Sequence, residues 1–101
     1  MYNVHMKIVF EWDENKNTEN EKKHGVSFEE ASTIFSHSLL GIFFDPDNST
    51  SEDRYIAIGF SIKNRILLVV HCENNKGTII RIISARKATK KEQRKVYGDK
   101  K

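Results

Sequence analysis

The sequence has 101 residues, of which 38% are hydrophobic and 31% charged, and its formal net charge is +3. A chain of this length forms one domain with its own core, so a multidomain enzyme is excluded and residues 1–101 are expected to be a single domain. There is no apolar run long enough for a membrane span or a secretory signal, and we expect a cytoplasmic protein without a membrane partner.

Charge is distributed unevenly along the chain. Residues 1–50 hold four Lys or Arg and nine Asp or Glu, whereas residues 51–101 hold 13 and five. The stretch 81–101 alone has nine basic residues and two acidic ones. Such a surface favours a polyanionic partner, although a solvated helical face that keeps the protein soluble explains the same count.

The first quarter of the chain predicts one short strand and two helices. The strand covers 7–12, and Asp13 can cap a polar helix over 14–24 that ends at Gly25. Ser27 and Glu30 form a capping box, which places a second helix over 28–36 with its apolar residues on one stripe.

The rest of the chain predicts four strands and a last helix. The expected strands cover 39–44, 54–62, 65–73 and 78–85, separated by polar turns and by a polar loop over 45–53. Thr89 and Glu92 form another capping box, so a short basic helix should begin there and end near Gly98. We therefore predict a compact α+β fold: an antiparallel sheet with two N-terminal helices and a short C-terminal helix, all on one face.

Two strand residues do not fit an apolar core. Arg81 interrupts the run Ile79–Ile83, and a buried unpaired arginine is costly, so Arg81 must reach solvent, pair with an acid such as Glu73, or face a phosphate. His71 closes the apolar run of the central strand. It is either a hydrogen-bonded structural histidine or a group with a chemical role.

The sequence lacks the usual signatures of metal and cofactor sites. The four histidines are scattered, the single cysteine Cys72 fits a small apolar filler, and no Gly-rich phosphate loop occurs. We predict neither a metal nor another cofactor.

Several blocks of the sequence, in order, resemble the BrnT family of type II toxins. The resemblance covers roughly residues 10–97, nearly the whole chain. Its blocks are Phe10-Glu11-Trp12-Asp13, Lys16, Asn20, residues 23–31, 54–61, 65–71 and 81–88, Glu92 and Tyr97.

This resemblance implies a RelE-like fold, metal-independent cleavage of RNA and arrest of translation. It also implies a small BrnA-like antitoxin with a ribbon-helix-helix DNA-binding part, so that the resting form is a hetero-oligomer of toxin and antitoxin.

RNA cleavage without a metal needs cations that hold the phosphate, a base for the 2′-OH and an acid for the leaving oxygen. Arg54, Arg81 and Arg86 are the predicted phosphate clamp, because guanidinium groups match phosphate oxygens. His71 is the candidate acid or base. Glu73, two residues on, is a weaker candidate base that can equally pair with Arg81.

Four further residues are candidate RNA contacts. Trp12 can stack on a base but also suits the core. Lys23 and His24 lie with Lys16 and Asn20 near one face of the polar first helix, which can guide RNA, contact the antitoxin or simply be solvated. Lys87 would add nonspecific attraction for phosphate.

Two other functions remain open from the sequence. One is a basic RNA- or DNA-binding module that does no chemistry. The other is a gyrase-poisoning toxin of the ParE type, which would leave RNA intact.

Overall fold

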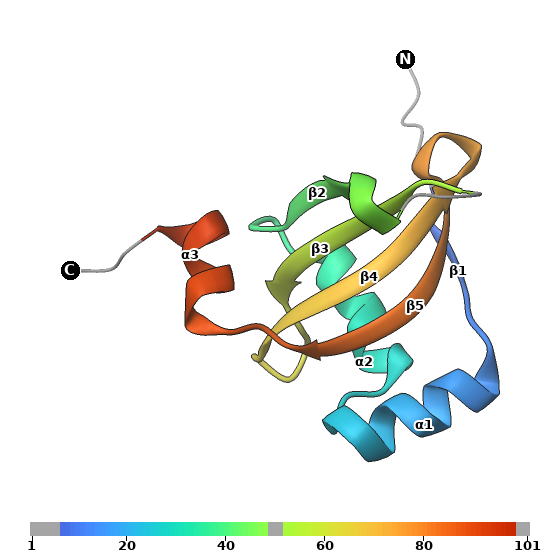
Figure 1. Ribbon diagram of the computed structural model, residues 1–101, viewed down its shortest axis with the longest axis horizontal. Coiled ribbons are helices and arrows are strands. Elements are labelled where there is room, and N and C mark those ends of the chain that lie inside the picture. Colours follow the sequence, from blue (N-terminus) through green and yellow to red (C-terminus); the bar gives the residue numbers. More distant parts are fainter. Residues whose placement is uncertain (1–6, 49–51, 99–101) are drawn as a thin grey trace.

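The computed structural model describes residues 7–48 and 52–98, in which five strands form one sheet with the order β1-β5-β4-β3-β2 (Figure 1). The strands are β1 (Val9–Glu11), β2 (Gly41–Asp45), β3 (Arg54–Phe60), β4 (Ile66–Asn74) and β5 (Ile79–Lys87). Strands β2 to β5 are antiparallel neighbours, but β1 pairs parallel with β5. The α+β prediction is confirmed, and the prediction of a purely antiparallel sheet is wrong at β1.

The polar first helix, α1 (Glu14–His24), forms where its capping residues predict it. The Asp13 carboxylate accepts hydrogen bonds from the backbone N–H groups of Asn15, at 2.8 Å, and Lys16, at 3.2 Å. Gly25 ends the helix with φ of 70°, a conformation that glycine adopts without a steric penalty.

The second predicted helix is shorter than expected. Helix α2 spans Phe28–Ser32 and continues as a 3₁₀ turn over Thr33–Ser36. Its apolar stripe of Phe28, Ala31 and Ile34 is fully buried against the sheet. This packing supplies most of the core that the amphipathic pattern predicts.

Helix α3 (Lys90–Tyr97) lies at one end of the sheet, away from α1 and α2 (Figure 1). Its Val96 and Tyr97 pack on a cluster that contains Ile58 and Leu68. Because successive strand residues point to opposite faces, Ile58 and Leu68 face away from Ala57 and Leu67, which pack with α2. The expectation that all helices share one face is therefore wrong for α3. We call the two sides the α2 face and the α3 face.

Strand β5 contains a β-bulge that sets where its side chains point. Val70 of β4 lies opposite Ser84, and the next residue, His71, lies opposite Ile82. Ile83 is therefore an extra residue in β5. Residues 81 and 86 would face opposite ways in a regular strand, but with the bulge both lie on the α3 face.

Asn20 attaches α1 to the exposed edge of β5 beyond the short strand β1. Its side-chain amide donates to the carbonyl oxygens of Ala85, at 2.8 Å, and Val26, at 2.9 Å, and its Oδ1 accepts from the Ala85 N–H at 3.1 Å. Asn17 accepts a hydrogen bond from the Phe28 N–H at 2.8 Å. Both side chains are buried, so amide hydrogen bonds hold this helix where an apolar stripe is missing.

Replacing Asn20 with alanine should destabilise the fold strongly. The change leaves the buried Ala85 N–H and C=O without their partner, and each buried unsatisfied group costs about 1–3 kcal/mol. We expect the free energy of unfolding to fall by about 2–3 kcal/mol in urea titrations. Asn15→Ala, at an exposed position of the same helix, is the control and should change it by less than about 0.5 kcal/mol. Equal stability of the two variants would contradict this role.

A buried carboxylate joins α2 to the turn between β3 and β4. Glu30 is 4% exposed and accepts hydrogen bonds from Ser61 Oγ at 2.7 Å and from Arg65 Nε at 2.9 Å. The Arg65 guanidinium, with the Ser61 hydroxyl, lowers the pKa of Glu30 against the opposing effect of burial. The Ser27–Glu30 block of the sequence thus has a structural role.

Candidate active site

Three rows of side chains cross β3, β4 and β5 on the α3 face. The strand registers place Arg54, Cys72 and Arg81 in one row, Ile56, Val70 and Ser84 in the next, and Ile58, Leu68 and Arg86 in the third. Directly opposed residues on neighbouring strands share a face. All three predicted clamp arginines therefore lie on the α3 face.

Arg81 is half-exposed and forms an ion pair with Glu52. Its Nη2 also lies 3.8 Å from Cys72 Sγ, and its buried Nε has no hydrogen-bond partner among the described residues. The sequence had offered Glu73 as the partner of Arg81. In the structure, the ion-pair partner of Arg81 is Glu52, which lies just before β3.

Cys72 is buried between the two arginines of its row. Burial raises the pKa of its thiol, and the neighbouring Arg54 guanidinium offsets part of that rise. The buried thiol fits the predicted role of a small filler in the sheet.

Arg86 is held by the last helix. Its Nη1 and Nη2 each donate to one oxygen of Glu92 at 2.8 Å, a two-pronged ion pair. Glu92 also accepts a hydrogen bond from the Thr89 backbone N–H at 2.8 Å, which completes the predicted capping box. Arg86 thus fastens α3 to β5, and its side chain is about as exposed as that of Arg81, at 40% and 39%.

This ion pair makes stability depend on pH. Hydrogen bonds from Arg86, reinforced by Thr89, lower the pKa of Glu92 from 4.5 to about 2, against the opposing effect of burial. A carboxylate with a lowered pKa stabilises the fold above its unfolded pKa, and this stabilisation is lost as pH falls from about 5 toward 2. We expect the difference in unfolding free energy between the wild type and Glu92→Gln to shrink over that range in urea titrations. A difference independent of pH would contradict this assignment.

The structure does not bring His71 together with the arginines. His71 points to the α2 face, is 0% exposed, and packs against the rings of Phe35 and Tyr55. Its Nε2 lies 2.9 Å from a carboxylate oxygen of Glu73, and its Nδ1 has no hydrogen-bond partner among the described residues. In this arrangement the sheet separates the imidazole from any phosphate bound on the α3 face.

The four candidate RNA contacts are spread over the molecule. Trp12 packs on the core, with its ring 6.1 Å from that of Phe28, and donates from Nε1 to Glu14 at 2.9 Å. Lys23 and His24 line a shallow pocket of about 200 Å³ between α1 and residues 83–84 of β5, together with Lys16 and Asn20. Lys87 is exposed at the end of β5, next to Arg86.

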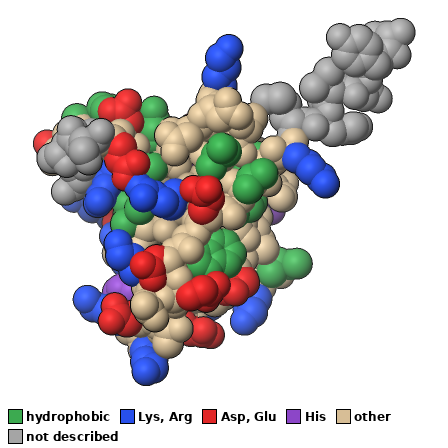
Figure 2. All heavy atoms as spheres, turned by 90° about the vertical axis from the view of Figure 1, so that its right-hand side faces the viewer, with side chains coloured by type: hydrophobic (Ala, Val, Ile, Leu, Met, Phe, Trp, Pro, Cys, Tyr) green, Lys and Arg blue, Asp and Glu red, His purple; other side chains and the backbone are tan. Residues whose placement is uncertain are grey.

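Acidic and basic side chains are interspersed on the side of the molecule where β1 lies (Figure 2). The charge asymmetry of the sequence does not become a uniform basic surface on this side. Positive charge is instead concentrated on α3, where four basic residues accompany one glutamate.

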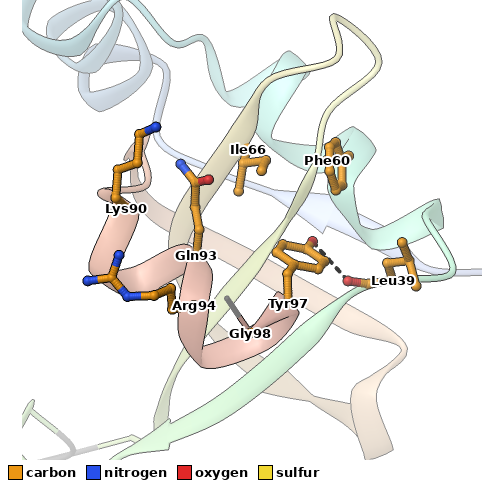
Figure 3. Close-up of a pocket in the computed structure, with 8 residues that line it drawn as sticks. All are labelled: Leu39, Phe60, Ile66, Lys90, Gln93, Arg94, Tyr97 and Gly98. Atoms are coloured by element: carbon orange, nitrogen blue, oxygen red, sulfur yellow. Dashed lines mark hydrogen bonds between the residues drawn. The ribbon is translucent and has the colours of Figure 1, made fainter. Parts of the chain in front are cut away.

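A larger pocket of about 370 Å³ lies between α3 and strands β3 and β4 (Figure 3). Phe60, Ile66 and Tyr97 supply apolar walls, and Lys90 and Arg94 supply charge. The Tyr97 hydroxyl donates to the Leu39 carbonyl oxygen at 2.9 Å, so Tyr97 anchors the end of α3.

Glu52 is a charged residue of this face that was not among the residues predicted from the sequence. It lies in a loop of several acidic residues, and its partner Arg81 is 29 positions away in the chain. One feature of the sequence could have indicated it: Glu52 lies two residues before Arg54, the candidate arginine at which β3 begins.

Two further properties concern the described part of the chain. Within residues 7–48 and 52–98, no three His, Cys, Asp or Glu side chains come together as a metal-binding group. No helix in these ranges has the length and apolar character needed to cross a membrane.

Comparison with known proteins identifies the family. The family described as "Ribonuclease toxin, BrnT, of type II toxin-antitoxin system" matches residues 12–92. The crystal structure of the Brucella abortus ribonuclease toxin BrnT matches with 30% sequence identity and a TM-score of 0.56, over 85% of this chain and 100% of that chain. No curated protein matches the chain. With most of its length matched, the chain belongs to the BrnT family of ribonuclease toxins of type II toxin–antitoxin systems.

Proposed function

We propose that this toxin cleaves RNA without a metal ion, by attack of the 2′-OH on the adjacent phosphate, and that Arg54 and Arg81 hold that phosphate on the α3 face. The observation that carries the proposal is the row Arg54–Cys72–Arg81 with Glu52 ion-paired to Arg81. It combines fixed cations with an exposed carboxylate on one side of the sheet.

The two arginines suit the charge that develops in this reaction. Attack at phosphorus places additional negative charge on the phosphate oxygens, and preorganised donors stabilise it more in the transition state than in the substrate. Arg81 is 39% exposed, and its ion pair with Glu52 is made through Nη2, so the guanidinium retains other N–H donors for a phosphate. Arg86 is already committed to Glu92 and supports this face by holding α3.

The base on this face is Glu52. His71 lies on the α2 face, the Cys72 thiol is buried with a raised pKa, and Glu92 is held by Arg86 and Thr89. Glu52 is 40% exposed and lies beside the guanidinium that would bind the phosphate. Its carboxylate can accept a proton from a neighbouring hydroxyl.

The reaction then proceeds as one displacement. The 2′-oxygen gives its proton to Glu52 and forms a bond to phosphorus, while the bond from phosphorus to the 5′-oxygen breaks and that oxygen takes a proton from solvent. The products are a 2′,3′-cyclic phosphate and a 5′-OH. In the cell this cleavage would arrest translation in the cytoplasm.

The partner of a type II toxin is an antitoxin. We further propose that it is a BrnA-like protein with a ribbon-helix-helix DNA-binding part, and that the resting form is a hetero-oligomer of the two. The support is the family membership of the chain.

The proposal is tested with purified, partner-free protein, EDTA and a labelled single-stranded RNA. We expect cleavage that survives EDTA and leaves a 2′,3′-cyclic phosphate. Loss of cleavage in EDTA, restored by a divalent cation, would overturn the metal-free mechanism. Salt-sensitive RNA binding without cleavage would favour a binding module, and intact RNA with impaired DNA supercoiling would favour a gyrase target.

A further inference from the structure

Strand β2 is an exposed edge of the sheet with an unusual composition. Within residues 7–48 and 52–98 it has a neighbour only in β3, and the side chains of Ile42, Phe43 and Phe44 are 44%, 38% and 51% exposed. Leu39, just before the strand, is 54% exposed. Edge strands are normally protected by charge, proline or a covering segment. Residues 39–44 contain no charged residue or proline, and the one charged residue of β2 is Asp45 at its end, followed by Pro46.

Adjacent strand residues point to opposite faces, so both faces of this edge are apolar. Phe43 lies opposite Ile56 and shares the α3 face with it, while Ile42 and Phe44 lie opposite Ala57 and Tyr55 on the α2 face. A segment added alongside β2 would cover all three side chains and pair with the outer backbone groups of the strand.

The pocket under α3 continues this surface. Leu39 lines the pocket and is joined to it by the hydrogen bond from Tyr97 (Figure 3). The pocket has apolar walls of Phe60 and Ile66, with Lys90 and Arg94 also lining it. This combination fits an apolar side chain that is flanked by carboxylates. We call β2, Leu39 and this pocket together the β2–α3 surface.

The charge of α3 distinguishes between two occupants. Helix α3 carries four basic residues, Lys90, Lys91, Arg94 and Lys95, and one acid, Glu92, which is ion-paired with Arg86. A second copy of the chain paired through β2 would bring another basic helix toward this one, so like charges would oppose the contact. An acidic partner is attracted by the same helix.

We propose that the antitoxin inhibits this toxin by laying an extended acidic segment on the β2–α3 surface. The segment adds a strand to the outer edge of β2, inserts an apolar side chain into the pocket and pairs its carboxylates with Lys90 and Arg94. The proposal rests on family membership for the existence of an antitoxin and does not depend on the cleavage mechanism.

The test measures binding of the cognate antitoxin, separated from the toxin by denaturation after co-expression, to refolded toxin variants by isothermal titration calorimetry. Phe43→Lys disrupts the strand edge, and the double change Lys90→Glu with Arg94→Glu reverses the charge at the pocket. Val9→Lys on β1, the opposite edge, is the matched control, because Val9 is an equally apolar strand residue with 54% exposure.

We expect Phe43→Lys and the charge reversal each to weaken binding at least about tenfold, with Val9→Lys unchanged. Wild-type affinity should fall with added salt more steeply than that of the charge-reversed variant. Circular dichroism and thermal unfolding establish that each variant is folded. Unchanged affinity in folded variants would overturn the proposal, as would a stable dimer of the toxin alone that Phe43→Lys dissociates. Because the readout is binding, these results stand whether or not the toxin cleaves RNA in vitro.

Discussion

Arg81→Ala is expected to reduce the rate of RNA cleavage by about 10²–10³-fold, the usual loss when one preorganised donor to a transition-state anion is removed. Arg81 shares its row with Arg54, is partly exposed, and is the arginine ion-paired to Glu52. Its removal takes away a fixed positive charge and leaves the Glu52 carboxylate without its partner. The measurement is kcat/KM for a labelled single-stranded RNA at neutral pH.

Two further variants separate charge from geometry. Arg81→Lys keeps the charge but loses the forked donors, so it should recover only part of the rate. Lys22→Ala removes a positive charge from exposed α1, away from the α3 face, and should leave the rate unchanged. If Arg81→Ala and Lys22→Ala reduced cleavage equally, general attraction of RNA by positive charge would replace the clamp as the explanation.

Glu52→Gln is expected to cause a comparable or larger loss, about 10²–10⁴-fold in kcat, the range for removal of a general base. The amide keeps the size of the side chain and can still contact Arg81, so the loss reports the missing proton acceptor. The measurement is kcat of both proteins for the same labelled RNA at neutral pH.

The control for this experiment is Asp47→Asn, which neutralises another exposed acid in the same connection between β2 and β3. Its kcat should match that of the wild type. A Glu52→Gln variant that cleaves at the wild-type rate, while Arg81→Ala does not, would show that a different group accepts the proton and would leave the arginine clamp in place.

Local signals in the sequence were sufficient for most elements of the fold. Capping residues such as Asp13 and Thr89 specify where helices begin, because they satisfy backbone N–H groups within the same turn. The alternation and length of the apolar runs specify the antiparallel strands β2 to β5. The pairing of β1 with β5 was not predictable in this way. It joins Val9 to Ile79, which are far apart in the chain, and no local pattern in either segment specifies which strand it pairs with.

The candidate site was predictable in its residue types and less so in its arrangement. Arg54 and Arg81 were recognisable as charged residues at strand positions, and the structure brings them into one row. His71 was also recognisable as a polar residue at a strand position. Its burial against Phe35 was not predictable, because it depends on which face of the sheet α2 covers. From the sequence, Asn17 and Asn20 could not be told apart from the exposed residues of a polar surface helix. Their burial was not predictable, because the backbone groups that they bind lie elsewhere in the chain.

The extra residue in β5 has a consequence for which changes in the gene the site tolerates. Loss of the single codon for Ile83 would restore regular alternation between Ile82 and Ser84. Arg81 and Arg86 would then be four positions apart, an even separation, so both would stay on the α3 face with Arg86 still tied to α3 through Glu92. A shortened gene of this kind would therefore keep the orientation of the arginines of the proposed site, and the bulge is a point at which the coding sequence can lose one codon without turning the strand over.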